Sequence, residues 1–352
     1  MVHPAPSVVL VTGVSRHLGS RLAVELTRDS RIERVIGVDT APPGPEIAGE
    51  LASVEFVRAD IRNPLIAKVI SSSGVDTVIH MSISATPWRT GGRAAMKEMN
   101  VIGTMQLLAA CQKSECVRRL VVKSATAVYG TSSRDPAAFR EDAEPPSAPR
   151  SGYAKDAAEI EGYVRGFRRR RPDVTVGLLR FANIIGPNVE TPLSRYFSLP
   201  TVPTVLGYDP RVQFLHEDDA VAVTRRVLQH PDPGTINVAG AGVLTLSQAI
   251  RRAGRIQLPV PAPSVGAVGR VLRGAGLLDV TPGSNRFVEF GRIVDTGRMR
   301  DELGFTPQYT TAKAFDAFIR GLPVRPVLDP ATVAGWERRL GAFLSAGGAA
   351  HV

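Results

Sequence analysis

The sequence has few cysteines and no long hydrophobic run. Its 352 residues include two cysteines, Cys111 and Cys116. On the helix expected around them they would not share a face, and we interpret them as small buried or half-buried apolar groups, not as metal ligands. No apolar run reaches the roughly 18 residues of a membrane span, and the N-terminus lacks the basic and apolar segments of a signal peptide. These absences exclude a membrane span and favour a soluble cytoplasmic protein with reduced thiols.

Positive charge is in excess, but it is spread along the chain. The formal net charge is +10. The densest basic patch, residues 168–171, ends a helix expected to begin near Tyr153, where cations complement the negative end of the helix dipole. We therefore expect no nucleic-acid partner, although a basic protein that binds nucleic acid or membrane, with an affinity that collapses in salt, stays a third hypothesis.

Short β-branched runs alternate regularly with helical patterns in the first half of the chain. Near-continuous apolar strands separated by helices are typical of a parallel sheet that is covered on both faces, the doubly wound Rossmann-type α/β arrangement. We expect strands at Val8–Val11, Arg34–Val38, Val54–Val57, Asp76–Ile79, Leu120–Lys123 and Val174–Leu179, and helices at Leu18–Thr27, Pro64–Ser71, Ala94–Gln112 and Gly152–Arg170.

The pattern changes after Pro187, where proline-rich connections separate shorter elements. We expect a Rossmann domain over residues 1–186 and a smaller substrate-binding lid over residues 187–325, some of whose elements return to the sheet. A C-terminal helix and tail should follow over residues 326–352.

The first turn of the Rossmann half, Thr12 to Gly19, lies where backbone amides and a helix N-terminus can hold a pyrophosphate. Gly13 can make the tight turn and Gly19 the close helix packing. Arg16 takes the place of the middle glycine, and it could either bind the pyrophosphate or crowd it. A glycine pair after a strand is also found in ordinary strand-to-helix turns, so this signal is weak by itself.

Two carboxylates at strand ends strengthen the prediction of a dinucleotide site. Asp39 ends the second strand twenty residues after Gly19, where a carboxylate binds the ribose hydroxyls of NAD and repels a 2′-phosphate. NAD is therefore favoured over NADP, with Arg16 as the contrary signal. Asp60 ends the third strand, where it could reach the adenine or cap the helix after Asn63.

Motifs at the ends of later strands complete a family pattern. In chain order, the sequence resembles the extended short-chain dehydrogenases, and among them the NAD-dependent epimerase/dehydratase group that includes UDP-glucose 4-epimerase. The resemblance runs from Val8 to about Phe318. Its motifs are Ile79-His80-Met81-Ser82, Asn100–Thr104, Ser124–Gly130, Leu179–Pro187, Phe214–Asp219, Gly234–Val238 and Leu303–Pro307.

The resemblance implies an enzyme that holds NAD tightly and oxidises a sugar carbon of a nucleotide sugar or related polyol. Such enzymes then return the hydride after rotation of the substrate or eliminate a neighbouring group, and they are usually homodimers through two long helices. The implied cofactor contacts come from Gly13, Ser15, Arg16, His17, Leu18, Gly19, Asp39, Asp60, Ile61, Met81, Ser82, Asn100, Lys123 and Tyr153.

The implied catalytic base is Tyr153, but its usual helper is missing. A free tyrosine, with a pKa of about 10, is ionised only to about one part in a thousand at pH 7. The family lysine that stabilises the phenolate lies four residues later, where this chain has Ala157. Lys155 points about 200° away around the helix and does not substitute easily.

The usual hydroxyl partner of the tyrosine is altered as well. The position that should carry serine or threonine is Ala125, flanked by Ser124 and Thr126. Their side chains would point to the opposite face unless the strand end twists. Lys123 shares a face with Ala125, and we hypothesise that it supplies the missing cation; the alternative is a lysine that extends from a strand edge into solvent.

Substrate contacts are expected from Asn183 and Arg211. The family commonly places a diphosphate-binding arginine where this chain has Val212, and Arg211 is one residue earlier, which reverses its face in a strand. The sequence therefore favours a divergent NAD-dependent epimerase or dehydratase. A catalytically impaired NAD-binding regulator or scaffold is the second hypothesis.

Overall fold

The computed structural model describes residues 5–87, 90–144, 149, 152–264, 266, 267, 269 and 287–322. The expected C-terminal helix and tail over residues 326–352 lie outside this set. No helix among the described residues is both long and apolar enough to cross a membrane.

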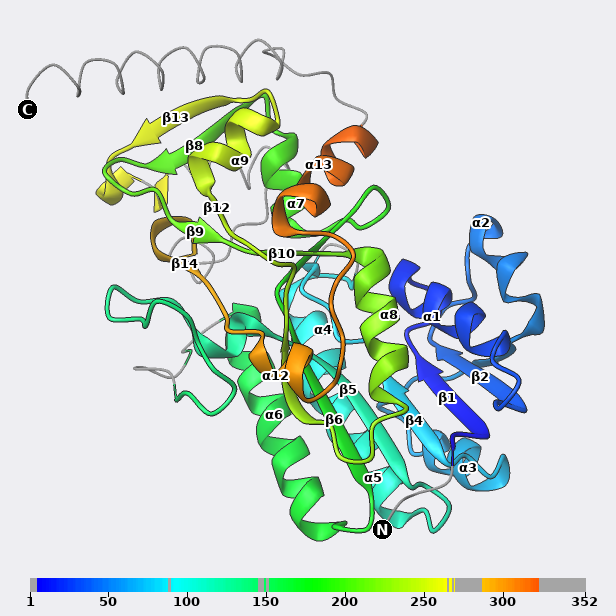
Figure 1. Cartoon of the computed structure of the whole chain (residues 1–352). Coiled ribbons are helices and arrows are strands. Elements are labelled where there is room, and N and C mark those ends of the chain that lie inside the picture. Colours follow the sequence, from blue (N-terminus) through cyan, green and yellow to red (C-terminus); the bar gives the residue numbers. More distant parts are fainter. Residues whose placement is uncertain are drawn as a thin grey trace, which may run out of the picture.

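A seven-stranded parallel sheet forms the centre of the molecule (Figure 1). Its strand order is β11-β6-β5-β4-β1-β2-β3, which confirms the expected doubly wound arrangement. Most of its residues are buried on both faces, as the continuous β-branched runs predict. The strands are β1 (Val8–Thr12), β2 (Arg34–Asp39), β3 (Glu55–Arg58), β4 (Thr77–His80), β5 (Arg119–Ala125), β6 (Thr175–Phe181) and β11 (Gly234–Val238).

Helices cover both faces of this sheet. Helices α1 (His17–Thr27) and α8 (Glu217–Val227) pack together over one hydrophobic cluster. A second cluster on the other face lies under α3 (Leu65–Ser72), α5 (Gly103–Lys113) and α6 (Gly152–Arg170). Figure 1 shows α1 beside α8, with the long α6 alongside β6.

Two expectations for this half need correction. The single helix expected over Ala94–Gln112 is divided into α4 (Arg93–Lys97), a π-helical turn (Glu98–Ile102) and α5. Cys111 is buried in α5, but Cys116 is exposed beyond the end of that helix, so it is not the half-buried group that was expected.

Shorter elements form a second layer over the carboxyl ends of the central strands. Its core is aromatic, with the ring of Phe197 against those of Phe214 and Phe315. The elements are β7 (Asn183–Ile185), α7 (Pro192–Ser198), β8 (Thr201–Val205), β9 (Arg211–Val212), β10 (Phe214–His216), β12 (Leu244–Thr245), α9 (Leu246–Arg252), β13 (Ile256–Val260), β14 (Gly291–Arg292) and α13 (Thr311–Gly321). Other short helical segments are α2 (Pro45–Ala48), η1 (Glu50–Ser53), η4 (Thr126–Tyr129), η5 (Ala262–Ser264) and α12 (Gly297–Asp301).

Candidate active site

A cavity of about 350 Å³ lies at the carboxyl ends of the sheet strands, between the central sheet and the second layer. It runs from the turn after β1, past the ends of β4 and β5, to the start of α6 and the segments that carry Asn183 and Arg292. Open parallel sheets bind their ligands at this edge. The turn and the tyrosine that the sequence singles out therefore share one cavity.

The turn after β1 is shaped by two glycines. Gly13 has a φ of +82°, and a Cβ there would lie 2.8 Å from the Ser82 Cα. A Cβ on Gly19 would lie 2.1 Å from the Gly13 carbonyl oxygen. Only glycine therefore lets β1, the end of β4 and α1 approach so closely, and this approach leaves the helix N-terminus open to an anion.

Arg16 crosses this turn and contacts the end of β4. Its Nη1 donates to the Ser82 carbonyl oxygen at 2.8 Å. Asp39 is half-buried at the end of β2, where its carboxylate accepts the Ser15 amide at 3.1 Å. The Ser15 hydroxyl donates to the Ala41 carbonyl oxygen at 2.5 Å. The glycine cradle, a cation beside it and a carboxylate at the next strand end fit the pyrophosphate and ribose of a dinucleotide.

Three other expected cofactor residues have protein partners in the structure. Asp60 makes an ion pair with Arg62 at 2.6 Å and does not cap the following helix, which has no side-chain cap. Ile61 is buried where Gly103 of α5 approaches it. Asn100 binds both the amide and the carbonyl oxygen of Ser84, at 2.9 and 2.7 Å. None of these three is among the described residues that line the cavity, and their contacts with the cofactor stay predictions.

The remaining expected cofactor residues lie nearer the cavity. His17, Leu18 and Met81 line it directly, whereas Ser82 contributes the backbone that Arg16 and Gly13 contact.

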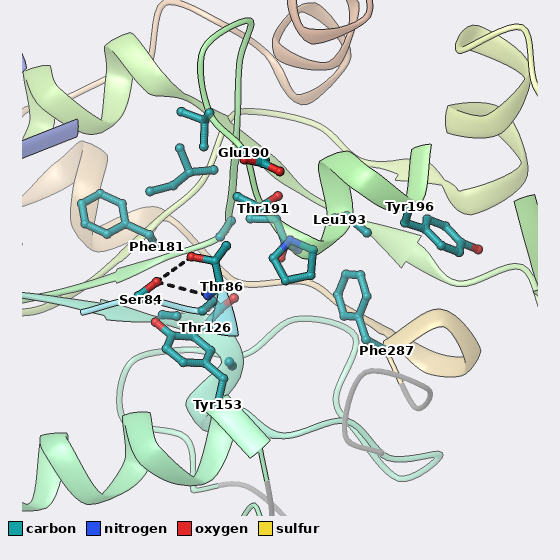
Figure 2. A pocket seen from close by; sticks show the side chains of 18 of the residues that line it. Ser84, Thr86, Thr126, Tyr153, Phe181, Glu190, Thr191, Leu193, Tyr196 and Phe287 are labelled. Carbon is teal, nitrogen blue, oxygen red and sulfur yellow. Dashed lines mark hydrogen bonds between the residues drawn. The ribbon is translucent and has the colours of Figure 1, made fainter. Parts of the chain in front are cut away.

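Tyr153 is half-buried near the start of α6 and lines the cavity. Figure 2 shows its hydroxyl end pointing toward Ser84 and Thr86. Burial raises the pKa of this phenol well above its usual value, and the carboxylates of Asp156 and Glu161 raise it further. At neutral pH the side chain is therefore a protonated phenol.

The position of the missing lysine is filled by apolar side chains. Ala157 is 2% exposed. It belongs to a cluster with Val128, Tyr129, Phe139, Ala182, Ala239 and Val294. This apolar cluster leaves no room for a long charged side chain at position 157. The structure therefore has no lysine side chain at the place where the family lysine would lie.

An ion pair holds the start of α6 at the residue before Ala157. Asp156 is completely buried, and its carboxylate lies 2.7 Å from the Arg93 guanidinium of α4. Arg93 also donates to the Gly152 carbonyl oxygen at 2.9 Å. The segment that carries Tyr153 is therefore fixed from α4.

Lys123, the cation of the compensation hypothesis, lies in the same cavity as Tyr153. Its Nζ donates to the Ile83 carbonyl oxygen at 2.8 Å, and the residue lines the cavity with Tyr153. Burial lowers the pKa of Lys123 to about 8, with a smaller effect from Arg16. The ammonium is thus inside the cavity and not in solvent, while its action on Tyr153 stays a prediction.

The two hydroxyls beside Ala125 differ in their surroundings. Ser124 donates to the Glu161 carboxylate at 2.7 Å, and Glu161 also pairs with Arg180. Thr126 begins the helical turn η4 and lines the cavity. Because β5 ends at Ala125, the change of backbone direction lets Thr126 face the same space as Tyr153 (Figure 2).

Ser84 and Thr86 form a hydroxyl pair that the sequence interpretation missed. Their side-chain oxygens lie 2.7 Å apart, and the Thr86 amide donates to Ser84 Oγ at 3.1 Å. Both residues are buried and line the cavity. The three hydroxyl residues directly after β4, at positions 82, 84 and 86, were the available signal, because open parallel sheets bind ligands at the carboxyl ends of their strands.

The two expected substrate contacts differ in placement. Asn183 is half-buried in β7 and lines the cavity. Arg211 is exposed in β9, donates to the Ala137 carbonyl oxygen at 3.1 Å and is not among the described lining residues. The arginine that lines the cavity from this small sheet is Arg292 of the neighbouring β14. No signal in the sequence could place it, since its position depends on the pairing of β14 with β9.

The profile of the family described as "NAD dependent epimerase/dehydratase family" matches residues 9–239. An uncharacterized protein of Mycobacterium tuberculosis (strain ATCC 25618 / H37Rv) is 48% identical over 338 residues, covering 96% of this chain and 90% of its own. A putative UDP-arabinose 4-epimerase of Arabidopsis thaliana is 29% identical over 188 residues, which are 51% of this chain and 41% of that protein.

Solved structures share the fold. UDP-glucose 4-epimerase of Thermotoga maritima, crystallised with UDP-glucose, has a TM-score of 0.69 at 19% identity and covers 89% of this chain and 98% of its own. dTDP-glucose 4,6-dehydratase of Bacillus anthracis, in complex with NAD, has a TM-score of 0.67 at 19% identity and covers 90% and 96%.

Proposed function

The chain belongs to the NAD-dependent epimerase/dehydratase family, and on this basis we propose that it is an enzyme acting on a nucleotide sugar or a related polyol. NAD is the cofactor of this family. The observation that carries the proposal is the single cavity that joins the glycine turn to Tyr153. A cofactor held at the turn and a substrate held near Asn183 would meet beside that tyrosine.

Bound NAD would supply the hydride acceptor and donor. Gly13, Gly19 and Arg16 would hold its pyrophosphate, and Asp39 its ribose. Tyr153 would act in its phenolate form, after its own proton has passed to solvent, and would take the proton of the substrate hydroxyl as the hydride leaves that carbon. The Lys123 ammonium, which lines the same cavity, would be the cation that favours the phenolate.

Hydroxyl groups would orient the substrate at this point. Ser84 and Thr86 come from the end of β4 and Thr126 from the end of β5, so they surround the place toward which Tyr153 points. They would replace the serine or threonine that is absent at Ala125. The same first oxidation serves both epimerisation and dehydration, and the family includes both reactions.

Mass spectrometry and an absorbance scan of the purified protein test the cofactor part. We expect NAD to co-purify or to bind on titration. Nucleotide sugars should then raise the absorbance at about 340 nm in the wild type, as expected for reduced nicotinamide, but not in Tyr153→Phe. A protein that neither retains nor binds NAD would refute the proposal.

A non-catalytic NAD-binding regulator or scaffold is the second candidate. Ala157 in its apolar cluster and the raised pKa of Tyr153 favour it, because both weaken the usual acid/base device. This candidate predicts bound NAD with no change in absorbance and no new isomer by NMR for any nucleotide sugar offered.

The family's usual homodimer is also part of the proposal, and light scattering of the purified protein would test it.

A further inference from the structure

Arg292 brings a positive charge that makes no ion pair into the substrate side of the cavity. Its Nε donates to the Gly130 carbonyl oxygen at 2.8 Å, and its guanidinium lies 5.6 Å from the centre of the Phe287 ring. Among the described residues, no carboxylate lies within ion-pair distance of it, and the carboxylate that acts on its charge from farther away is that of Asp135. The two terminal nitrogens therefore stay available to a ligand.

The charges around the cavity are also unbalanced. Its described lining contains Arg16, Lys123 and Arg292, against one carboxylate, that of Glu190. Glu190 is already paired with Arg195 at 2.5 Å. Arg16 and Lys123 donate to backbone carbonyl oxygens at the end of β4, on the cofactor side. Arg292 is thus the cation left for the substrate.

The place of Arg292 indicates which part of a substrate it would meet. Gly130, its backbone partner, follows the turn η4, whose first residue is Thr126 beside Tyr153. The guanidinium is therefore held to the segment that borders the reaction centre. Burial also lowers its pKa to about 10, and the Asp135 carboxylate offsets only part of this cost of burying the charge.

Resting on the proposed function, we infer that the substrate is an acidic sugar, whose ring carries a carboxylate that Arg292 binds through its terminal nitrogens. A guanidinium with a free fork matches the two oxygens of a carboxylate, and such charge-assisted pairs are strong in a buried site. A neutral sugar would leave the arginine desolvated and unpaired. The preference for an acidic over a neutral sugar therefore has two causes, the attraction of the carboxylate and the cost of burying the guanidinium without it.

Calorimetry on the NAD-loaded protein tests the inference with UDP-glucuronic acid, UDP-glucose and UDP. The wild type should bind the acid about 10 to 100 times more tightly than UDP-glucose. Arg292→Met should remove this preference while its affinities for UDP-glucose and UDP change less than about twofold. Arg300→Met, which removes an exposed arginine of α12, should behave as the wild type.

Three results would overturn the inference. The first is equal affinity of the wild type for UDP-glucuronic acid and UDP-glucose. This measurement needs no variant, so it decides the inference even if Arg292→Met does not fold. Equal weakening of all three ligands by Arg292→Met would assign the arginine to the diphosphate. A selective loss in Arg211→Met would assign the carboxylate to the exposed arginine of β9. If NAD binds but none of the three ligands does, the proposed substrate class itself fails, and this result is distinct from the other three.

Discussion

The lysine near the end of β5, Lys123, is the residue on which we propose that the chemistry of Tyr153 depends. Lys123→Met should lower turnover of the identified substrate by about 10- to 100-fold, because the cavity that holds Tyr153 loses the cation that we propose to stabilise the phenolate. In the wild type, turnover should fall as the pH rises through about 8, where this ammonium loses its proton. Steady-state rates over pH 6 to 10 measure both effects.

The stability of the same variant provides an independent control. Because the pKa of Lys123 is lower in the folded protein than in the unfolded chain, its charge opposes folding below about pH 8. Lys123→Met should therefore have a higher melting temperature than the wild type at pH 7, and the gain should vanish as the pH approaches 10.5. Unchanged turnover together with unchanged cofactor binding would refute the role of Lys123.

The hydroxyl pair after β4 gives a second prediction for single residues. Ser84→Ala should lower kcat by about 10-fold or more, since Ser84 is the hydroxyl toward which Tyr153 points. Ser124→Ala is the matched control, because its hydroxyl is bound to Glu161 and should affect stability more than rate. A larger loss of kcat in Ser124→Ala would show that the hydroxyl acts from β5.

At the scale of elements, helix α6 combines the tyrosine with an apolar cluster where the family has a lysine. Ala157→Lys should not restore activity. It should destabilise the protein by at least about 3 kcal/mol, because a charged side chain would be forced into a close-packed apolar cluster. Urea denaturation would measure this, with the adjacent, half-exposed Ala158→Lys as the control. Higher turnover at unchanged stability would contradict our interpretation of this cluster.

Elements also show how far the sequence could predict the site. The strands and the turn from Gly13 to Gly19 follow from apolar runs and glycine spacing, which are local signals. The absence of the lysine that usually assists Tyr153 could also be predicted, because it follows from the local spacing between Tyr153 and Ala157. In contrast, the charge of Arg292 reaches the cavity through a contact between distant segments, the pairing of β14 with β9. Spacing along the chain carries no information about such contacts.

At the scale of the whole molecule, the buried His80 joins β4 to β1 next to the turn after β1. His80 lies between the hydroxyls of Thr12 and Thr104, at 2.8 Å from each. Burial lowers its pKa to about 3, and the charges of Lys123 and Arg16 contribute. The imidazole is therefore neutral in the folded protein at every pH at which the enzyme would work.

This histidine should make the fold sensitive to acid. The unfolded chain takes up a proton at His80 below about pH 6.5, whereas the folded protein does not until about pH 3. Stability should therefore fall by about 1.4 kcal/mol per pH unit from this group as the pH decreases through that window. We expect the free energy of unfolding, measured by urea denaturation at pH 7.5, 6 and 5, to fall less steeply with decreasing pH in His80→Gln than in the wild type. If the unfolding free energies of the two proteins change equally with pH, His80 is not the source of the acid sensitivity.

The small sheet over the cavity has a consequence for how substrate preference can change. Gly291 has a φ of +68°, and a Cβ there would lie 2.1 Å from the Arg211 carbonyl oxygen, so glycine fixes the register of β14 on β9. That register decides which arginine enters the cavity and which faces solvent. With the role that we propose for Arg292, substrate choice can therefore be altered at a position that touches no ligand. Searches for residues that distinguish its relatives should include such backbone positions as well as the cavity wall.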